Sequence, residues 1–162
     1  MKRDMDRLSA ALGGIRRIAV VVLMAVVAVG VYALPLDKYS INREDLPQAA
    51  RDFLTEYFPK AKVSMVKVDK HLLKKTDYDV KLVNGTKIEF NNKGAWTSID
   101  CQTREVPQGI VIKPIRNYVA KNYPGRKIVG IGKKTTYFEV ELDNDVELRF
   151  DRLGGFQKVV SD

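Results

Sequence analysis

The sequence predicts an α+β fold made of two tandem repeats, each a helix packed on a four-stranded antiparallel meander sheet. Three observations predict it. Blocks of sequence recur at a constant offset of 60 residues, each copy opens with an amphipathic helical pattern, and alternating apolar residues follow that pattern.

Four blocks recur at this offset. Residues 46–48 match 106–108, 78–82 match 138–142, 87–90 match 147–150, and 94–96 match 154–156. Four matches at one offset are hard to obtain by chance. We therefore expect a linker at 34–45, a first repeat at 46–105 and a second repeat at 106–162.

The helical pattern of each repeat places apolar residues three and four apart, on one stripe of a helix. The first stripe ends at Pro59 and uses Ala50, Phe53, Leu54, Tyr57 and Phe58. The second ends near Pro124 and uses Ile115, Tyr118, Val119 and Ala120. Proline is tolerated in the first turn of a helix, so Pro114 is expected to mark the start of the second helix, after an extended link at 106–113.

Strand patterns follow each helix. A first strand is expected around Val63 to Val68, and its counterpart around Ile128 to Ile131. The next two strands alternate with period two, which indicates half-buried antiparallel strands. Their predicted inward residues in the first repeat are Tyr78, Val80, Leu82, Ile88 and Phe90. A short last strand carries Trp96 in one repeat and Phe156 in the other.

The hairpin between these strands has two possible loops. A two-residue loop at Asn84-Gly85 would place Lys87 on the buried face opposite Leu82, whereas a three-residue loop, 83–85, pairs Val80 with Ile88. We expect the longer loop because the facing of side chains determines register, with Gly85 left-handed. Residues 143–145 are expected to do the same in the second repeat.

Two sets of side chains are expected to join each helix to its strands. The first set is Phe53, Tyr57, Tyr78, Val80, Ile88, Phe90 and Trp96. The second set is Ile115, Tyr118, Phe138, Val140, Leu148, Phe150 and Phe156.

The N-terminal segment has the layout of a secretory signal. Arg16 and Arg17 precede fourteen uncharged residues, Ile18 to Val31, and Ala33 offers a small residue at a cleavage site. We expect residues 1–33 to be a signal peptide cleaved after Ala33. An uncleaved anchor from Ile18 to Leu36 is the alternative, and a buried helix is a third. In both of the first two cases the folded part lies outside the cytoplasm.

Composition excludes several function classes. The chain has 28 Lys and Arg against 20 Asp and Glu, and residues 1–33 hold five of the former and two of the latter, so residues 34–162 carry a mild net charge of +5. A nucleic-acid partner is not expected of an exported protein. Cys101 is the one cysteine, so no intramolecular disulfide forms, and a buried small apolar residue is favoured over a reactive thiol.

No pattern for catalysis, a metal or a cofactor occurs. His71 is the one histidine and is expected in a solvated loop, without a metal-spaced partner. Motifs for zinc proteases, phosphate loops, calcium loops and nucleophilic triads are missing. Asp79 and Glu89 would be neighbours on the outer face, where a solvated face is favoured over an acid–base pair. We expect no enzyme activity and no cofactor.

The order of these elements resembles a known family. A helix ending in Tyr57-Phe58-Pro59, the strand Tyr78 to Leu82, a turn, the strand Ile88-Glu89-Phe90 and the closing Gly94-Ala95-Trp96 are similar to PepSY-like domains. The tandem type, described as beta-lactamase-inhibitor-like and common in exported proteins of Bacteroidetes, is the nearest, over about residues 46–160. The second repeat departs from it in its longer helix region and in lacking a loop between its first two strands.

The resemblance implies an exported, non-enzymatic binding module, an inhibitor or regulator of a peptidase or hydrolase. A membrane-tethered envelope protein with a structural or stress-response role is the alternative, and membrane contact would then be made by the N-terminal segment alone. A protein partner is expected. The candidate partner-binding residues are the outward-facing Lys81, Lys87, Glu139, Glu141, Glu147 and Arg149.

Overall fold

The computed structural model describes residues 37–70 and 76–160. The expected signal peptide, its alternative as an anchor, the cleavage site after Ala33 and the loop around His71 lie outside the described residues. Within the described residues, no helix combines the length and the hydrophobicity that a membrane span requires.

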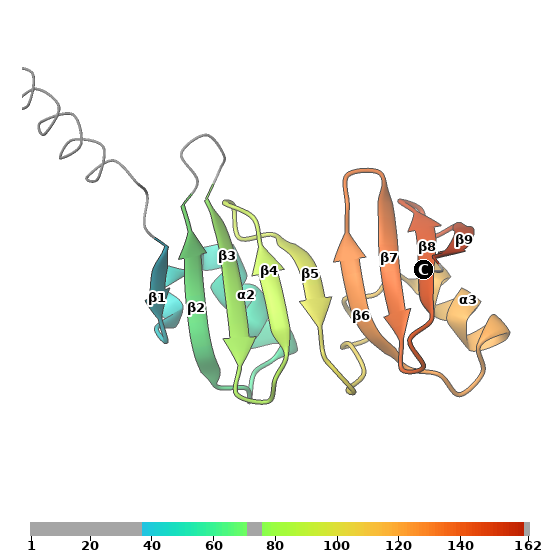
Figure 1. Ribbon diagram of the computed structural model, residues 1–162, viewed down its shortest axis with the longest axis horizontal. Coiled ribbons are helices and arrows are strands. Elements are labelled where there is room, and N and C mark those ends of the chain that lie inside the picture. Colours follow the sequence, from blue (N-terminus) through green and yellow to red (C-terminus); the bar gives the residue numbers. More distant parts are fainter. Residues whose placement is uncertain (1–36, 71–75, 161–162) are drawn as a thin grey trace, which may run out of the picture. The chain divides into compact units, whose positions relative to one another are not determined.

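The described chain forms an antiparallel sheet of nine strands and two α-helices (Figure 1). The elements in chain order are β1 (Lys38–Ser40), the 3-10 helix η1 (Arg43–Asp45), α2 (Gln48–Tyr57), β2 (Val63–Asp69), β3 (Asp77–Leu82), β4 (Lys87–Phe90), β5 (Trp96–Asp100), α3 (Lys113–Asn122), β6 (Ile128–Lys133), β7 (Tyr137–Leu142), β8 (Glu147–Asp151) and β9 (Phe156–Val160). The strands are ordered β1 to β9 across the sheet, so each pairs with its neighbours in the chain.

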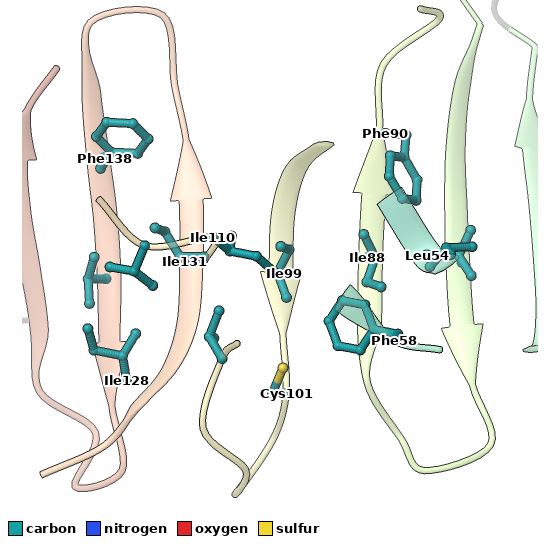
Figure 2. Close-up of a cluster of buried hydrophobic side chains, with 14 of the residues drawn as sticks. Leu54, Phe58, Ile88, Phe90, Ile99, Cys101, Ile110, Ile128, Ile131 and Phe138 are labelled. Atoms are coloured by element: carbon teal, nitrogen blue, oxygen red, sulfur yellow. The ribbon is translucent and has the colours of Figure 1, made fainter. Parts of the chain in front are cut away.

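The sequence predicted two separate sheets, and the structure instead has one continuous sheet. The two halves join where β5 pairs with β6, through Ile99 opposite Ile131 and Asp100 opposite Gly130. Ile99 and Ile131 are 1% and 3% exposed, and Figure 2 shows Ile110 beside Ile99 at this junction. Burial of these aliphatic side chains favours pairing of the two edges, which separate sheets would leave open.

One row of apolar side chains crosses the sheet on its inner face. According to the strand register, this row consists of Val66, Val80, Ile88, Ile99, Ile131, Val140, Leu148 and Val159. Because side chains two apart share a face, Phe90 and Phe150 also point inward. Phe53 of α2 meets Phe90 edge to face at 5.7 Å, and Tyr118 of α3 meets Phe150 at 5.3 Å. Both helices therefore cover the same face.

Most of the predicted core is confirmed. Phe90, Phe150, Ile88 and Leu148 are fully buried, and Phe53, Tyr57 and Tyr118 of the helix stripes pack partly buried against the core. One expectation is wrong, and another holds only in part. Ala120, placed on the second helical stripe, is exposed, and Phe156 is 39% exposed because it lies on the edge strand β9. Phe156 still stacks on Tyr118, with ring centroids 4.5 Å apart.

The segments expected to be linkers carry more structure than predicted. Within 34–45, β1 pairs with β2 and η1 follows it, tied by a hydrogen bond from Ser40 to Asp45 of 2.5 Å. The expected extended link at 106–113 contains a turn, and Val106, Ile110 and Val111 are buried in the core. The second helix begins at Lys113, so Pro114 lies in its first turn as predicted.

Both hairpins have the predicted three-residue loops. Val80 lies opposite Ile88 and Val140 opposite Leu148, and Gly85 has a φ of 91°. Asp145 takes the equivalent left-handed position in the second hairpin, with a φ of 62°. Side-chain facing thus determined the register in both halves.

Candidate functional site

The outer face of the sheet, opposite the helices, is polar and forms two cross-strand rows. The first row contains Lys81, Lys87, Asp100, Gly130, Glu141 and Glu147. The second contains Lys67, Asp79, Glu89, Ser98, Gly132, Glu139, Arg149 and Lys158. The structure therefore brings all six predicted partner-binding residues onto one face.

The first row changes sign along the sheet. Lys81 lies opposite Lys87 across β3 and β4, while Glu141 lies opposite Glu147 across β7 and β8. Asp100 stands between these pairs, and the Lys87 ammonium lies 3.4 Å from its carboxylate. The row thus runs from basic at β3 and β4 to acidic at β5 to β8.

Glu141 is a partly buried carboxylate of this acidic region. Partial burial, followed by the neighbouring charges of Asp100, Glu147 and Asp145, raises the pKa of its carboxyl above the ordinary value. A cation brought near Glu141 would relieve this repulsion. The acidic region is therefore suited to a basic group of a partner.

The second row has its own ion pair next to the acidic region. Arg149 donates a hydrogen bond of 2.6 Å to Glu139, and its guanidinium lies 4.2 Å from the ring of Tyr137. This pairing satisfies Glu139 internally. Of the predicted acidic residues, Glu141 and Glu147 remain the ones available to a partner, since neither forms an ion pair among the described residues.

A depression of about 180 Å³ lies in the middle of this face. Gly130 and Gly132 of β6 form its floor, where the first half carries Met65 and Lys67 at the equivalent positions. The sequence analysis did not identify these glycines as part of a site. Glycine within a strand often marks a place where another group approaches closely. The presence of Gly130 and Gly132 within one strand is therefore the sequence signal that could have identified this site.

The opposite end of the outer face holds a cluster of carboxylates around one ammonium. The Lys67 ammonium lies 3.1 Å from Asp37 and 2.9 Å from Asp69, and hydrogen bonds to these two carboxylates raise its pKa. Asp79 is the cross-strand neighbour of Lys67. Burial raises the pKa of the Asp79 carboxyl, and the charges of Asp69 and Asp77 raise it further, whereas the charge of Lys67 lowers it. Lys67 thus supplies the positive charge that this cluster needs.

Two chemical features predicted from the sequence can be placed. Cys101 is 1% exposed, and burial raises the pKa of its thiol, which keeps the thiol protonated, as expected of a structural cysteine. Asp79 and Glu89 are cross-strand neighbours on the outer face. Within 37–70 and 76–160, no group of three or more His, Cys, Asp and Glu side chains is arranged to hold a metal ion.

Comparison with protein families identifies the chain's relatives. The family model described as "Putative beta-lactamase-inhibitor-like, PepSY-like" matches residues 76–158, half of the chain. The chain belongs to the PepSY-like family. The predicted family resemblance is thereby confirmed, and this PepSY-like chain has no match among curated proteins.

Solved structures of similar proteins come from Bacteroides. A Bacteroides vulgatus protein described as periplasmic and of unknown function is 38% identical, with a TM-score of 0.74, over 78% of this chain and all of that one. A protein described as calcium-regulated and periplasmic, from Bacteroides thetaiotaomicron, is 34% identical over 77% and 97% of the two chains, with a TM-score of 0.72. A second Bacteroides vulgatus protein described as periplasmic, from the DUF2874 family, is 37% identical with the same coverage and TM-score.

Proposed function

We propose that this PepSY-like protein is an exported, non-enzymatic binding module that holds a protein partner on the outer face of its sheet. The observation that carries the proposal is the polarity of the first row, with the like-charged pair Lys81 and Lys87 at one end and Glu141 and Glu147 at the other. Such a face can orient a partner that carries the complementary charges.

The size of the face supports a protein partner rather than a small molecule. Nine strands spaced about 4.8 Å apart span roughly 40 Å, enough for the ~800 Å² per partner of a standard interface. The central depression is small and open to the face, so it would receive a single side chain of a partner. Its lining includes four carboxylates, Asp100, Glu139, Glu141 and Glu147, beside the cation Lys134, and this excess of acid favours a lysine or arginine there.

Duplication accounts for the size of this face, and we include it in the proposal. A register shift occurs at Val63/Met65 and at Ile128/Gly130, and a second occurs at Glu89/Phe90 and at Arg149/Phe150. Irregularities shared at matching places support the view that the two halves are tandem repeats. Repetition doubled the sheet and left each half free to acquire charges of opposite sign.

We propose that the protein acts in the periplasm, as three similar proteins are described to do, and regulates a peptidase or hydrolase there. The basic and apolar N-terminal segment supports export, with cleavage after Ala33. A tethered form, with Ile18 to Leu36 retained, is the alternative, and the N-terminal sequence of the protein recovered from cell envelopes distinguishes the two. Calcium regulation, described for one relative, is not part of the proposal.

The experiment that tests this function has two stages. The full chain, tagged at its C-terminus and expressed in its native envelope, is cross-linked, and the captured proteins are identified. Association of the leading partner is then measured at low and high salt with the wild type and with Glu141→Lys/Glu147→Lys. We expect the double variant to associate more slowly, most strongly at low salt.

A matched control distinguishes an effect of the outer face from an effect of net charge. Glu56→Lys/Glu105→Lys makes the same change in charge at exposed positions on α2 and in the segment before α3, away from the outer face. The proposal predicts nearly wild-type association for this control. Equal slowing in both double variants, or none in either, would show that the outer face does not bind that partner.

A further inference from the structure

An apolar pocket of about 530 Å³ lies where the C-terminal end of α2 meets the start of β2 and the turn between β3 and β4. We refer to it as the α2–β2 corner. Its apolar wall includes Phe58, Pro59, Ala61 and Val83, and its lining also includes Lys60 and Lys62. This corner lies at an end of the strands and shares no lining residue with the depression on the outer face.

The second half contains the same corner in its backbone. The amide of Val83 donates to the carbonyl of Lys62 at 2.8 Å, and the amide of Asp143 donates to that of Lys127 at 3.0 Å. Before these lysines, the Ala61 amide donates to Phe58, and Arg126 donates equivalently to Tyr123, both at 3.1 Å. Ala61 is therefore the counterpart of Arg126, and Val83 is the counterpart of Asp143.

The side chains at these matched positions differ in kind. In the second half, the Arg126 guanidinium lies 3.9 Å from the Asp143 carboxylate, and this polar pair spans the corner. In the first half, Ala61 and Val83 stand there instead, and Val83 is 67% exposed. The same backbone thus carries a solvated ion pair in one half and a water-exposed apolar surface in the other.

The two charged side chains that line the α2–β2 corner are both lysines. Lys60 and Lys62 are exposed, and within the described residues neither forms an ion pair. Lys60 stands at the position of Gly125 in the second half, so the corner has two cations although Ala61 stands at the position of Arg126. Among the residues that the structure describes, no carboxylate lines the pocket.

We propose that the α2–β2 corner binds an alkyl carboxylate, a free fatty acid. The alkyl chain lies on Phe58, Ala61 and Val83, and the carboxylate is held by Lys60 and Lys62. A pocket of about 530 Å³ is within the range of roughly 300–1,000 Å³ typical of small-molecule sites. The pairing of an apolar wall with unpaired ammonium groups matches the two ends of such a ligand.

Titration of the full chain, isolated from the envelope of expressing cells, tests this proposal. The probes are octanoate and 1-octanol, which share an alkyl chain and differ in charge, and the readouts are calorimetry and amide NMR shifts. We expect saturable octanoate binding, with shifts at Ala61 and Val83. Lys60→Gln/Lys62→Gln should weaken octanoate binding roughly two- to fivefold and leave octanol binding unchanged.

A variant that replaces the apolar wall of the corner with an ion pair gives the sharper test. Ala61→Arg/Val83→Asp transfers the ion pair of the second half to the α2–β2 corner, and Arg126 and Asp143 show that this backbone accommodates it. We expect this variant to keep its circular dichroism spectrum and lose octanoate binding. The matched control, Arg126→Ala/Asp143→Val, should leave binding at the α2–β2 corner unchanged.

Three outcomes would overturn the proposal. They are the absence of saturable octanoate binding by the wild type, unchanged binding by Ala61→Arg/Val83→Asp, and shifts confined to residues away from the corner. None of these outcomes bears on the outer face, because the partner assay there uses a different surface and different variants.

Discussion

Glu141 lies directly opposite Glu147 across β7 and β8, at the positions that Lys81 and Lys87 occupy across β3 and β4. The two hairpins thus carry like-charged pairs of opposite sign in the same register. Facing like charges destabilise a sheet slightly, and water and salt screen the cost at an exposed face. The pairs follow from the three-residue loops, because a shift of one residue would send these side chains inward.

The Glu141 carboxyl should make stability depend on pH in a defined direction. Its pKa is raised by partial burial and by Asp100, Glu147 and Asp145, so the folded state holds the proton more tightly than the unfolded state does. The contribution of this group to the free energy of unfolding therefore falls as pH rises from about 4.5 through the raised value.

Glu141→Gln removes the loss of stability that accompanies ionisation of this carboxyl in the wild type. We expect the variant to be more stable than the wild type at pH 7, and the difference to shrink towards zero below pH 4.5, where both states of the wild type are protonated. Urea denaturation across this pH range measures it, with Glu105→Gln as a control for lost charge. A difference that grows towards low pH would contradict the assignment.

Phe90 and Phe150 are equivalent residues, 1% and 0% exposed, at the centre of each helix–sheet contact. Phe90→Ala and Phe150→Ala should each lower the free energy of unfolding by about 3–5 kcal/mol, because each leaves a cavity under its helix. Leu153→Ala, at an 84% exposed position, should change it by less than about 0.5 kcal/mol. Losses below about 1 kcal/mol at both phenylalanines would show that the inner face has been assigned wrongly.

Gly154 and Gly125 both have positive φ values, 87° and 78°, but their surroundings differ. A Cβ at Gly154 would lie 2.7 Å from Pro114 Cβ, whereas one at Gly125 would meet nothing within 4 Å. Gly125→Ala should lower the free energy of unfolding by about 1–2 kcal/mol, because backbone strain is its sole cost. Gly154→Ala should cost at least about 1 kcal/mol more, because Pro114 must also move. Thermal and urea denaturation measure the stability of both variants. Equal losses of stability would contradict the close packing of Gly154 against Pro114.

Gly130 and Gly132 form a second matched pair, on the floor of the outer depression. A Cβ at Gly130 would lie 3.1 Å from Glu141 Cβ, whereas one at Gly132 would have its nearest neighbour at 3.8 Å. Gly130→Ala should therefore cost about 1 kcal/mol more than Gly132→Ala in the free energy of unfolding. The reverse order would mean that Glu141 moves aside freely and does not constrain the floor.

Local sequence patterns determined much of the fold. The spacing of Leu54 and its neighbours predicted α2, and the alternation around Val80 and Ile88 predicted β3, β4 and their register. These features depend on residues close together in the chain, where helix and strand periodicity apply directly. The same alternation placed Lys81, Lys87, Glu141 and Glu147 on the outer face, and their binding role stays a prediction.

Tertiary structure decided what depends on distant residues. The burial of Ile99 against Ile131 joins the halves into one sheet, and pairing of β1 with β2 gives structure to a segment without a strand pattern. The depression appears because β5 brings Asp100 beside Gly130, and the α2–β2 corner appears because Ala61 and Val83 line one pocket beside the start of β2. The sequence by itself determined both α-helices, the strands β2 to β9, the facing of most of their side chains and the family. Only the fold determined these contacts, because each arises between side chains whose local patterns carry no information about one another.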